Sequence, residues 1–279
     1  MIDYHIHTVH SSDAEGSLDD YCRRALNLGL SEICFTNHCE LDPKRNDNVI
    51  RLDGQVLPLS PTSLAVLQEE VGRVKDKYRK SGLIVRFGLE VGFFEGVEKR
   101  LRDMTADLEL DYLITGIHCL EHVCIDSSRE YEGYFTKHDA ARLMEKYYKL
   151  AETLVESRLF DTFAHLDVYK KYGIGYYGAE AMRQLPVERL NVIFKKMAQQ
   201  GLALEINTAG LRRVDEFYPS GMFMRMAKEA GVENIAIGSD CHKVDDLGKG
   251  IKEGYEFARS FGFKAVCGFE KRKPIFFKI

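Results

Sequence analysis

Residues 1–38, MIDYHIHTVHSSDAEGSLDDYCRRALNLGLSEICFTNH, contain a complete strand–helix–strand unit. Short apolar runs at Ile2–His7 and Ile33–Thr36 are typical of buried strands, and the longer amphipathic stretch Leu18–Leu28 between them is typical of a helix. Ser17 supplies a helix start signal and Gly29 a stop signal. A unit of this kind predicts two parallel strands that are joined by a helical crossover.

The same alternation continues along the chain. Further strands are predicted at Leu83–Leu89, Tyr112–Ile117, Asp161–Ala164, Leu202–Ile206 and Asn234–Ile237. Further helices are predicted at Ser63–Lys80, Val97–Leu108, His138–Ser157, Val187–Gln200, Met222–Ala230 and Leu247–Phe261. This repetition favours an α/β fold with a parallel sheet, and no composition break divides the chain, so residues 1–279 are expected to form a single domain. Three segments are expected to be long loops: Cys39–Ser60, Cys119–Lys137 and Val168–Pro186. The basic and aromatic C-terminus is expected to fold back on the sheet.

Composition excludes several classes of protein. The 279 residues are 45% hydrophobic and 29% charged, with a formal net charge of −4. No apolar run approaches the ~20 residues of a membrane-spanning helix, and the first residues do not have the pattern of a signal peptide. Seven cysteines without regular spacing indicate reduced thiols in a cytoplasmic protein. Because there is no basic stripe, we expect neither a nucleic acid nor a membrane as partner.

Histidines are concentrated at the ends of the predicted strands. Six of the nine histidines lie there, and only His10, His122 and His138 do not. The polar residues at strand ends are His5, His7, His38, Glu90, His118, His165, Glu205, Asn207, Asp240 and His242. In a barrel of parallel strands these ends meet on one face, where active sites lie. A single histidine of this kind is as easily explained as a hydrogen-bonded core residue, but the joint pattern predicts one shared site.

The types of these side chains point to metal ions. Imidazole and carboxylate groups suit zinc, manganese or iron. Residues separated by one position, such as His5 and His7, project to the same side of an extended chain. Three cysteines that directly follow candidate ligands are therefore expected to turn away and to be core thiols: Cys39, Cys119 and Cys241.

The number of candidate ligands indicates more than one ion. The candidates are His5, His7, Asp13, His38, Glu90, His118, His165, Asp240 and His242. A catalytic ion usually has about three protein ligands, so this set predicts two or three divalent ions. Such a site would remain positive despite its carboxylates, which favours a phosphate monoester as substrate.

Six short motifs, in this order, resemble those of the PHP (polymerase and histidinol phosphatase) family. They are His5-Ile6-His7 with Asp13, Thr36-Asn37-His38, Gly88-Leu89-Glu90, Gly116-Ile117-His118, His165-Leu166-Asp167 and Ser239-Asp240-Cys241-His242. The resemblance implies a distorted (β/α)7 TIM-like barrel with a trinuclear metal centre at the carboxyl ends of the strands. It implies one ion held by His5, His7, Glu90 and Asp240, and a second held by Glu90, His118 and His165, with Glu90 bridging. The third would be held by Asp13, His38 and His242.

Within the family, the chain is most similar to the stand-alone histidinol-phosphate phosphatases. The similarity to this group lies in the length of the chain and in the segments Leu166–Gly173, Glu205–Arg213 and Tyr218–Ser220. It implies hydrolysis of L-histidinol phosphate to L-histidinol and phosphate, a step of histidine biosynthesis. Side chains near these strand ends are candidates for binding the substrate phosphate: Lys170, Lys171, Asn207, Arg212 and Arg213. The sequence does not decide which lysine or which arginine faces the site.

The favoured hypothesis is a metal-dependent phosphomonoesterase in which a hydroxide bridging two ions attacks phosphorus. Asp13, His242 or a metal-bound water is the candidate acid for the leaving alkoxide. One alternative is a PHP phosphoesterase that acts on another small monoester, a nucleotide or phosphotyrosine. A nucleic-acid phosphodiesterase is disfavoured by the net charge, and a non-catalytic binding module by the presence of all nine ligands. The expected partner is a small phosphorylated substrate, and the oligomeric state stays open.

Overall fold

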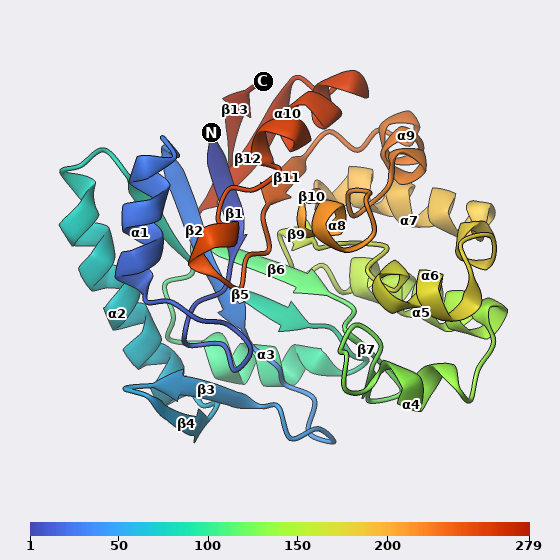
Figure 1. Cartoon of the computed structure of the whole chain (residues 1–279), viewed down its shortest axis with the longest axis horizontal. Helices are drawn as coiled ribbons and strands as arrows, with labels where there is room; N and C mark the ends of the chain where they lie inside the picture. The colour runs from blue at the N-terminus through green and yellow to red at the C-terminus, as the bar shows by residue number, and fades with distance from the viewer.

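The structure, a computed structural model, describes all 279 residues and is built around seven parallel strands (Figure 1). In sheet order these are β1 (Ile2–Ile6), β2 (Glu32–His38), β5 (Ile84–Gly92), β6 (Tyr112–Gly116), β9 (Thr162–Phe163), β10 (Ala203–Asn207) and β11 (Ile235–Gly238). The amide of His7 donates to the carbonyl of Cys241 at 3.0 Å, and Ile6 forms a bridge with Cys241. The sheet therefore curves into a nearly closed barrel, in which β1 meets the end of β11. The predicted strands are all present, with ends shifted by a few residues.

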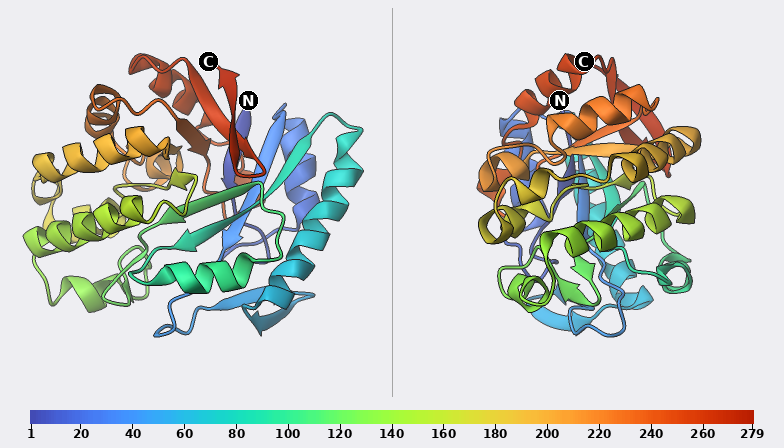
Figure 2. Two further views of the ribbon diagram at one scale, coloured as in Figure 1. Left: turned by 180° about the vertical axis from the view of Figure 1, so that it is seen from behind. Right: turned by 90° about the vertical axis from the view of Figure 1, so that its right-hand side faces the viewer.

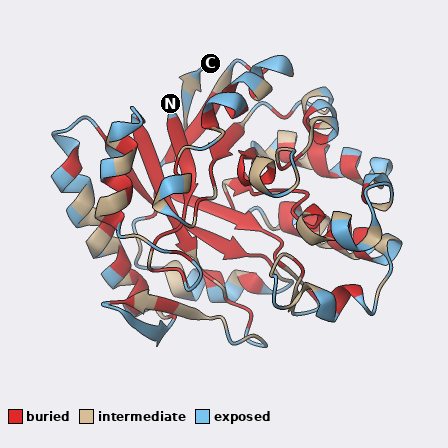
Figure 3. Ribbon diagram, in the orientation of Figure 1, coloured by how far each residue is buried: buried red, intermediate tan, exposed pale blue.

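Helices surround this barrel, as Figure 2 shows from two further sides. The helices that were expected are α1 (Leu18–Asn27), α2 (Pro61–Arg79), α3 (Val97–Thr105), α5 (Ala140–Ser157), α7 (Val187–Gln200), α9 (Gly221–Glu229) and α10 (Ile251–Ser260). Ser17 caps α1 in a capping box with Asp20, which satisfies free amides of the first turn. Each helix turns its buried face to the strands, so that one apolar core fills the molecule (Figure 3). None of these helices is both long and apolar enough to cross a membrane.

The segment Val168–Pro186 is not the loop that was expected. It contains α6 (Lys170–Tyr177) and the short 3-10 helix η1 (Ala181–Arg183). The glycines and tyrosines of this segment hid the helical pattern in the sequence. In the structure α6 packs against the short helix α4 (Tyr131–Phe135), where the ring centroids of Tyr172 and Tyr131 are 4.4 Å apart in a stacked arrangement. Two more short helices are also present, namely α8 (Ala209–Arg213) and the 3-10 helix η2 (Val244–Asp246).

Three antiparallel hairpins lie outside the barrel. They pair β3 (Val49–Leu52) with β4 (Gln55–Pro58), β7 (Cys119–Leu120) with β8 (Val123–Cys124), and β12 (Ala265–Glu270) with β13 (Lys273–Lys278). The first two hairpins occupy the long segments that were expected to be loops. The third confirms that the C-terminus folds back, because Arg272 forms an ion pair with Asp161, the residue before β9.

A self-contained polar cluster lies at the amino ends of the strands. We call Tyr4, Glu32, Arg86 and Asp111 the amino-end cluster. Nε of Arg86 donates to Glu32 at 2.7 Å, and the hydroxyl of Tyr4 donates to the same carboxylate. Nη1 of Arg86 also lies 2.9 Å from the carboxylate of Glu270. No buried side-chain atom of this cluster lacks a hydrogen-bond partner.

Candidate metal centre

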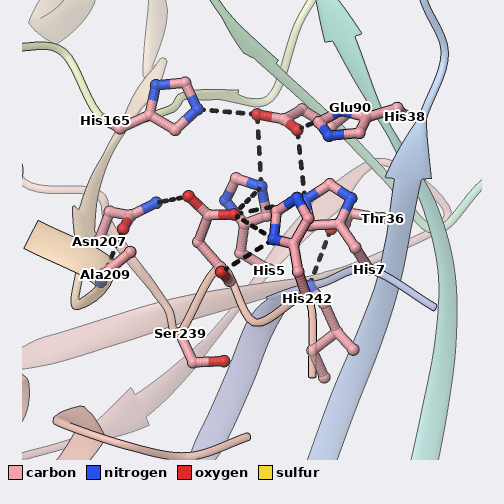
Figure 4. Close-up of polar contacts among 12 residues, drawn as sticks. His5, His7, Thr36, His38, Glu90, His165, Asn207, Ala209, Ser239 and His242 are labelled. Atoms are coloured by element: carbon pink, nitrogen blue, oxygen red, sulfur yellow. Dashed lines mark hydrogen bonds and ion pairs between the residues drawn. The ribbon is translucent and has the colours of Figure 1, made fainter. Parts of the chain in front are cut away.

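The opposite, carboxyl ends of the strands bring all nine candidate ligands together. Figure 4 shows six of them, His5, His7, His38, Glu90, His165 and His242. We call His5, His7, Asp13, His38, Glu90, His118, His165, Asp240 and His242 the carboxyl-end cluster. Its members come from six strands or from the first residues after them, and Asp13 comes from the loop between β1 and α1. Segments far apart in the sequence thus supply one site.

Glu90, from strand β5, is the centre of the cluster and is only 1% exposed. Its two carboxylate oxygens lie within 3.3 Å of imidazole nitrogens of His5, His7, His38, His118 and His165. Oε1 faces His5, His118 and His165, whereas Oε2 faces His7 and His38. A carboxylate with different imidazoles on each oxygen can bridge two ions.

Asp13 and His242 lie at the mouth of the site. Oδ2 of Asp13 is 3.3 Å from Nε2 of His242 and 3.6 Å from Nε2 of His38. The side chain of Asp13 is 56% exposed and that of His242 is 30% exposed, in contrast to Glu90. These two residues, which were candidates for the catalytic acid, are therefore the members of the cluster that a substrate reaches first.

Unusual backbone conformations and two glycines allow these side chains to lie close together. His165 and Asp240 have φ angles of 27° and 49°, in the left-handed region that is uncommon for residues other than glycine. Backbone outliers of this kind persist where the surrounding structure holds them, and they gather at functional sites. Gly116 and Gly238 end β6 and β11, and a Cβ at either position would overlap the side chain of a neighbouring cluster histidine.

Burial and mutual contact shift the pKa values of the cluster strongly. Burial alone would lower the pKa of His5, but the surrounding carboxylates, Glu205 first, outweigh it and hold that pKa well above its ordinary value. Burial and two neighbouring imidazoles lower the pKa of His7 to about 3. Burial would raise the pKa of Glu90, but the imidazoles around it hold that pKa well below its ordinary value. Shifts of this size in a cluster of titratable groups are typical of functional sites.

The residues present fit divalent metal ions. Nε2 of His5, Nε2 of His7 and Nδ1 of His38 are buried without a hydrogen-bond partner, although all three point toward Glu90. A buried polar atom without a partner costs about 1–3 kcal/mol. Nitrogen and oxygen atoms of the cluster also form four overlapping sets in which all ligand atoms lie within 4.8 Å of one another, and a fifth set joins Glu40 to His38 and His118. Such sets are what ions with imidazole and carboxylate ligands require.

Two carboxylates that sequence analysis did not select hold the rings of the cluster in place. Oε1 of Glu205 lies 2.6 Å from Nδ1 of His5, and Oε1 of Glu40 lies 2.8 Å from Nδ1 of His118. A carboxylate on the second ring nitrogen orients a ligating histidine and raises its basicity. Glu205 carried the strand-end signal and was not selected. Glu40 follows β2 by two residues, in a segment that was expected to be a loop.

The five candidate phosphate-binding residues differ in what they contact. Nζ of Lys170 is surrounded by Asp167, Glu216 and Ser220 at 2.8, 3.3 and 3.1 Å. Lys171 is half-buried, with its Nζ over the ring of Tyr172.

The other three candidates follow β10. Nδ2 of Asn207 donates to Glu205 and to Asp240, each at 3.1 Å, so this amide fixes a carboxylate of the cluster. Nη2 of Arg212 donates to the carbonyl of Ser239 at 2.8 Å, and its Nη1 is buried without a partner. Arg213 is exposed. The structure therefore places Arg212, rather than Arg213, against the segment that carries Asp240.

Comparison with known proteins shows to which family the chain belongs. The PHP domain matches residues 3–209, which is most of the chain. The chain belongs to the PHP family. Among PHP relatives it is 34% identical to a probable histidinol-phosphatase of Deinococcus radiodurans, over 98% of each chain. It is 28% identical to a probable histidinol-phosphatase of Thermotoga maritima, over 96% of this chain and 95% of that protein.

A solved structure agrees with the PHP fold. The histidinol phosphate phosphatase of Lactococcus lactis, determined with zinc, L-histidinol and phosphate, superposes with a TM-score of 0.79 at 20% identity. The match covers 98% of both chains. The likeness confirms the prediction of a distorted (β/α)7 TIM-like barrel.

Proposed function

We propose that this PHP protein is a metal-dependent phosphomonoesterase that hydrolyses L-histidinol phosphate to L-histidinol and phosphate. The observation that carries the proposal is Glu90, whose two oxygens face separate groups of imidazoles, with unpaired ring nitrogens of His5, His7 and His38 directed at it. The names of the relatives support histidinol phosphate as the substrate. On this proposal residues 1–279 form one domain, since the barrel closes between its first and last strands.

The metal ions on this proposal number two or three and are zinc, manganese or iron. His5, His7, Glu90 and Asp240 would hold the first, and Glu90, His118 and His165 the second. Asp13, His38 and His242 would hold the third. When bound, ions at these positions supply Lewis-acid stabilisation of the charge that develops on the phosphoryl oxygens.

The protein's own side chains complete the site. Nη1 of Arg212 is the free guanidinium donor beside Asp240, and we assign it to a phosphate oxygen of the substrate. Asn207 holds the carboxylate of Asp240 in position. In a site with two ions, where no third ion occupies them, Asp13 or His242, at the mouth, delivers a proton to the leaving alkoxide. Lys170 already has three oxygen neighbours, so we assign it to holding the segment after β9.

The test is release of inorganic phosphate from L-histidinol phosphate, measured with and without a chelator, beside a 5′-mononucleotide, phosphotyrosine and a nucleic-acid diester. We expect histidinol phosphate to have the highest kcat/KM and the chelator to abolish its turnover. A higher kcat/KM for another monoester would contradict the assignment of histidinol phosphate as the substrate, but it would still agree with the assignment of phosphomonoesterase activity. Turnover of the diester alone would overturn the phosphomonoesterase assignment.

Two neighbouring arginines provide a matched pair for the phosphate contact. Arg212→Met removes a donor next to Asp240, whereas Arg213→Met removes an exposed charge from the next position. Because a hydrogen bond to a charged group contributes about 1.5–3 kcal/mol, Arg212→Met should lower kcat/KM by roughly 10- to 100-fold. Arg213→Met should leave it nearly unchanged. Equal losses in the two variants would contradict the assignment.

A further inference from the structure

The hairpin that follows His118 brings two cysteines together. Cys119 lies directly opposite Cys124 in the β7–β8 register, and their Sγ atoms are 2.8 Å apart. The expectation that Cys119 is a core thiol is wrong, because β6 ends at Gly116 and the chain then turns into this hairpin, where Cys119 is only half-buried.

The geometry of the hairpin suits a cross-strand bond. Its two turn residues, Glu121 and His122, have φ angles of 50° and 69°, as in the type I′ turn that joins paired strands tightly. The amide of Ile125 donates to the carbonyl of His118 at 2.8 Å, so the adjacent pair, Cys119 and Cys124, occupies a site without backbone hydrogen bonds. Cα atoms at such sites are about 4.5 Å apart, which lies within the range that a disulfide spans.

The surroundings hold the hairpin in this conformation. Arg45 forms a two-pronged ion pair with Glu130 at 2.8 and 2.9 Å, and also donates to the carbonyl of His122. The carboxylate of Glu130 accepts the amide of Cys124 at 3.3 Å, and the ring of His122 contacts Asp42. The two thiols are therefore preorganised, and joining them requires no rearrangement of a mobile loop.

The other cysteines differ from this pair. Cys22, Cys34, Cys39, Cys241 and Cys267 are all buried, whereas Cys119 and Cys124 are both partly exposed. Oxidants from solvent therefore reach these two thiols first, since susceptibility to oxidation follows exposure as well as thiolate character.

We propose that Cys119 and Cys124 are a site of reversible oxidation that forms an intramolecular disulfide on reaction with a hydroperoxide. The sulfur of one cysteine attacks the peroxide oxygen, the O–O bond breaks, and a sulfenic acid and one water (or alcohol) form. The second thiol then attacks the sulfenic sulfur, the S–S bond forms, and a second molecule of water leaves. The two sulfurs together lose two electrons and two protons, and the peroxide gains them. A dithiol reductant reverses the change.

The position of the disulfide links it to the candidate metal centre. Cys119 is the next residue after His118, and Cys124 precedes Ile125, whose amide binds the carbonyl of His118. The cross-link therefore fixes the backbone on both sides of one imidazole of the carboxyl-end cluster. The disulfide itself does not depend on the proposed phosphatase activity, so failure of either proposal leaves the other standing.

The test uses the full chain, treated with a small excess of hydrogen peroxide and then alkylated under denaturing conditions. Cleavage after lysine and arginine releases residues 103–129, which contain Cys119 and Cys124 and no other cysteine. We expect this peptide to lose both alkylation sites and to become lighter by two hydrogen atoms, and a dithiol reductant to restore both sites. The peptides with the five buried cysteines should stay fully alkylated.

Three variants keep the result interpretable. Cys124→Ser should leave a sulfenic acid at Cys119 that dimedone traps, with no disulfide in the peptide, and Cys119→Ser should leave the corresponding acid at Cys124. Cys22→Ala, at a buried helix position, should not alter the disulfide. Full alkylation of residues 103–129 after peroxide, direct oxidation to sulfinic acid, or a disulfide only between two molecules would each overturn the proposal.

Discussion

The two ends of the barrel both bury polar side chains, and they satisfy them differently. At the amino ends, Arg86 lies against Glu32 with their side chains 8% and 2% exposed, and every buried side-chain atom of the amino-end cluster has a partner. At the carboxyl ends, Glu90 and His5 are equally buried, yet the nitrogens of His5, His7 and His38 that face the carboxylate lack hydrogen bonds. In a barrel of this type, side chains at the carboxyl end of the strands carry chemistry and those at the amino end carry stability.

The difference shows how to separate a structural polar cluster from one that is built for a ligand. Removing one partner of a buried ion pair destabilises the fold, because the other charge stays buried without a partner. A cluster with unpaired donors and acceptors has instead given up stability, as functional sites commonly do. Substitutions at the two ends should therefore affect different measurements.

Glu90→Gln should have the largest effect on catalysis. The substitution keeps the shape of the side chain and removes the charge that faces five imidazoles, so the site loses its bridging carboxylate. Loss of several kcal/mol of transition-state stabilisation lowers kcat/KM for phosphate release by on the order of 10³-fold. Bound metal per chain, measured by elemental analysis, should fall as well. The unfolding free energy of the metal-free variant should fall as well, because His5 and His118 lose the counter-charge that raises their pKa values. Unchanged metal content in the folded variant would make Glu90 a structural residue alone.

Arg86→Met is the matched change at the other end of the barrel. It leaves the carboxylate of Glu32 buried with only the hydroxyl of Tyr4 as a side-chain partner. Breaking a buried ion pair by removing one partner costs about 3–5 kcal/mol, which chemical denaturation will detect. The turnover of the protein that remains folded should match the unsubstituted protein. The double variant Glu32→Gln, Arg86→Met should recover part of the stability, and purely additive losses would contradict coupling of the pair.

Sequence alone predicted the carboxyl end of the barrel better than its surroundings. The strand-end residues could be found because alternation and helix caps are local signals, and because parallel strands bring their ends together whatever lies between them. Glu40 could not be found, since its role depends on how the segment after β2 returns to His118. The choice between Arg212 and Arg213 required α8, a helix too short to have a periodic pattern. The contacts of Lys170 with Glu216 and Ser220 likewise join segments whose proximity is a property of the folded chain.

Glu205→Gln and Glu40→Gln should have intermediate effects, because these carboxylates act through His5 and His118. Loss of such a partner typically lowers metal affinity or activity by about 10- to 100-fold. Glu205 should matter more, since it is 1% exposed and also accepts the amide of His165, whereas Glu40 is 13% exposed. Titration with metal should restore much of the activity in both variants. If saturating metal restores nothing, the two residues do more than position histidines.

The smallest expected effect is a pH dependence of stability that differs between the metal-free and the metal-loaded protein. In the metal-free protein, burial would lower the pKa values of His5, His38 and His118, but neighbouring carboxylates raise them well above the ordinary value. A raised histidine pKa stabilises the fold fully below the unfolded value of about 6.5, and this stabilisation is lost as the pH rises through the folded pKa. His7, whose pKa is lowered to about 3, has the opposite sign and costs stability below about 6.5.

The melting temperature of the metal-free protein should therefore be highest near pH 6.5 and fall by a few degrees on the alkaline side. Metal ions compete with protons for the same nitrogens, so their stabilising effect grows as the pH rises. The gap in Tm between loaded and metal-free protein, followed by thermal unfolding from pH 6.5 to 9, should widen steadily. His118→Gln removes one of the raised groups and should flatten the alkaline fall of the metal-free protein. A constant gap in Tm would mean that the imidazoles of the carboxyl-end cluster are already neutral without metal, and that this cluster, like the one at the amino ends, is complete by itself.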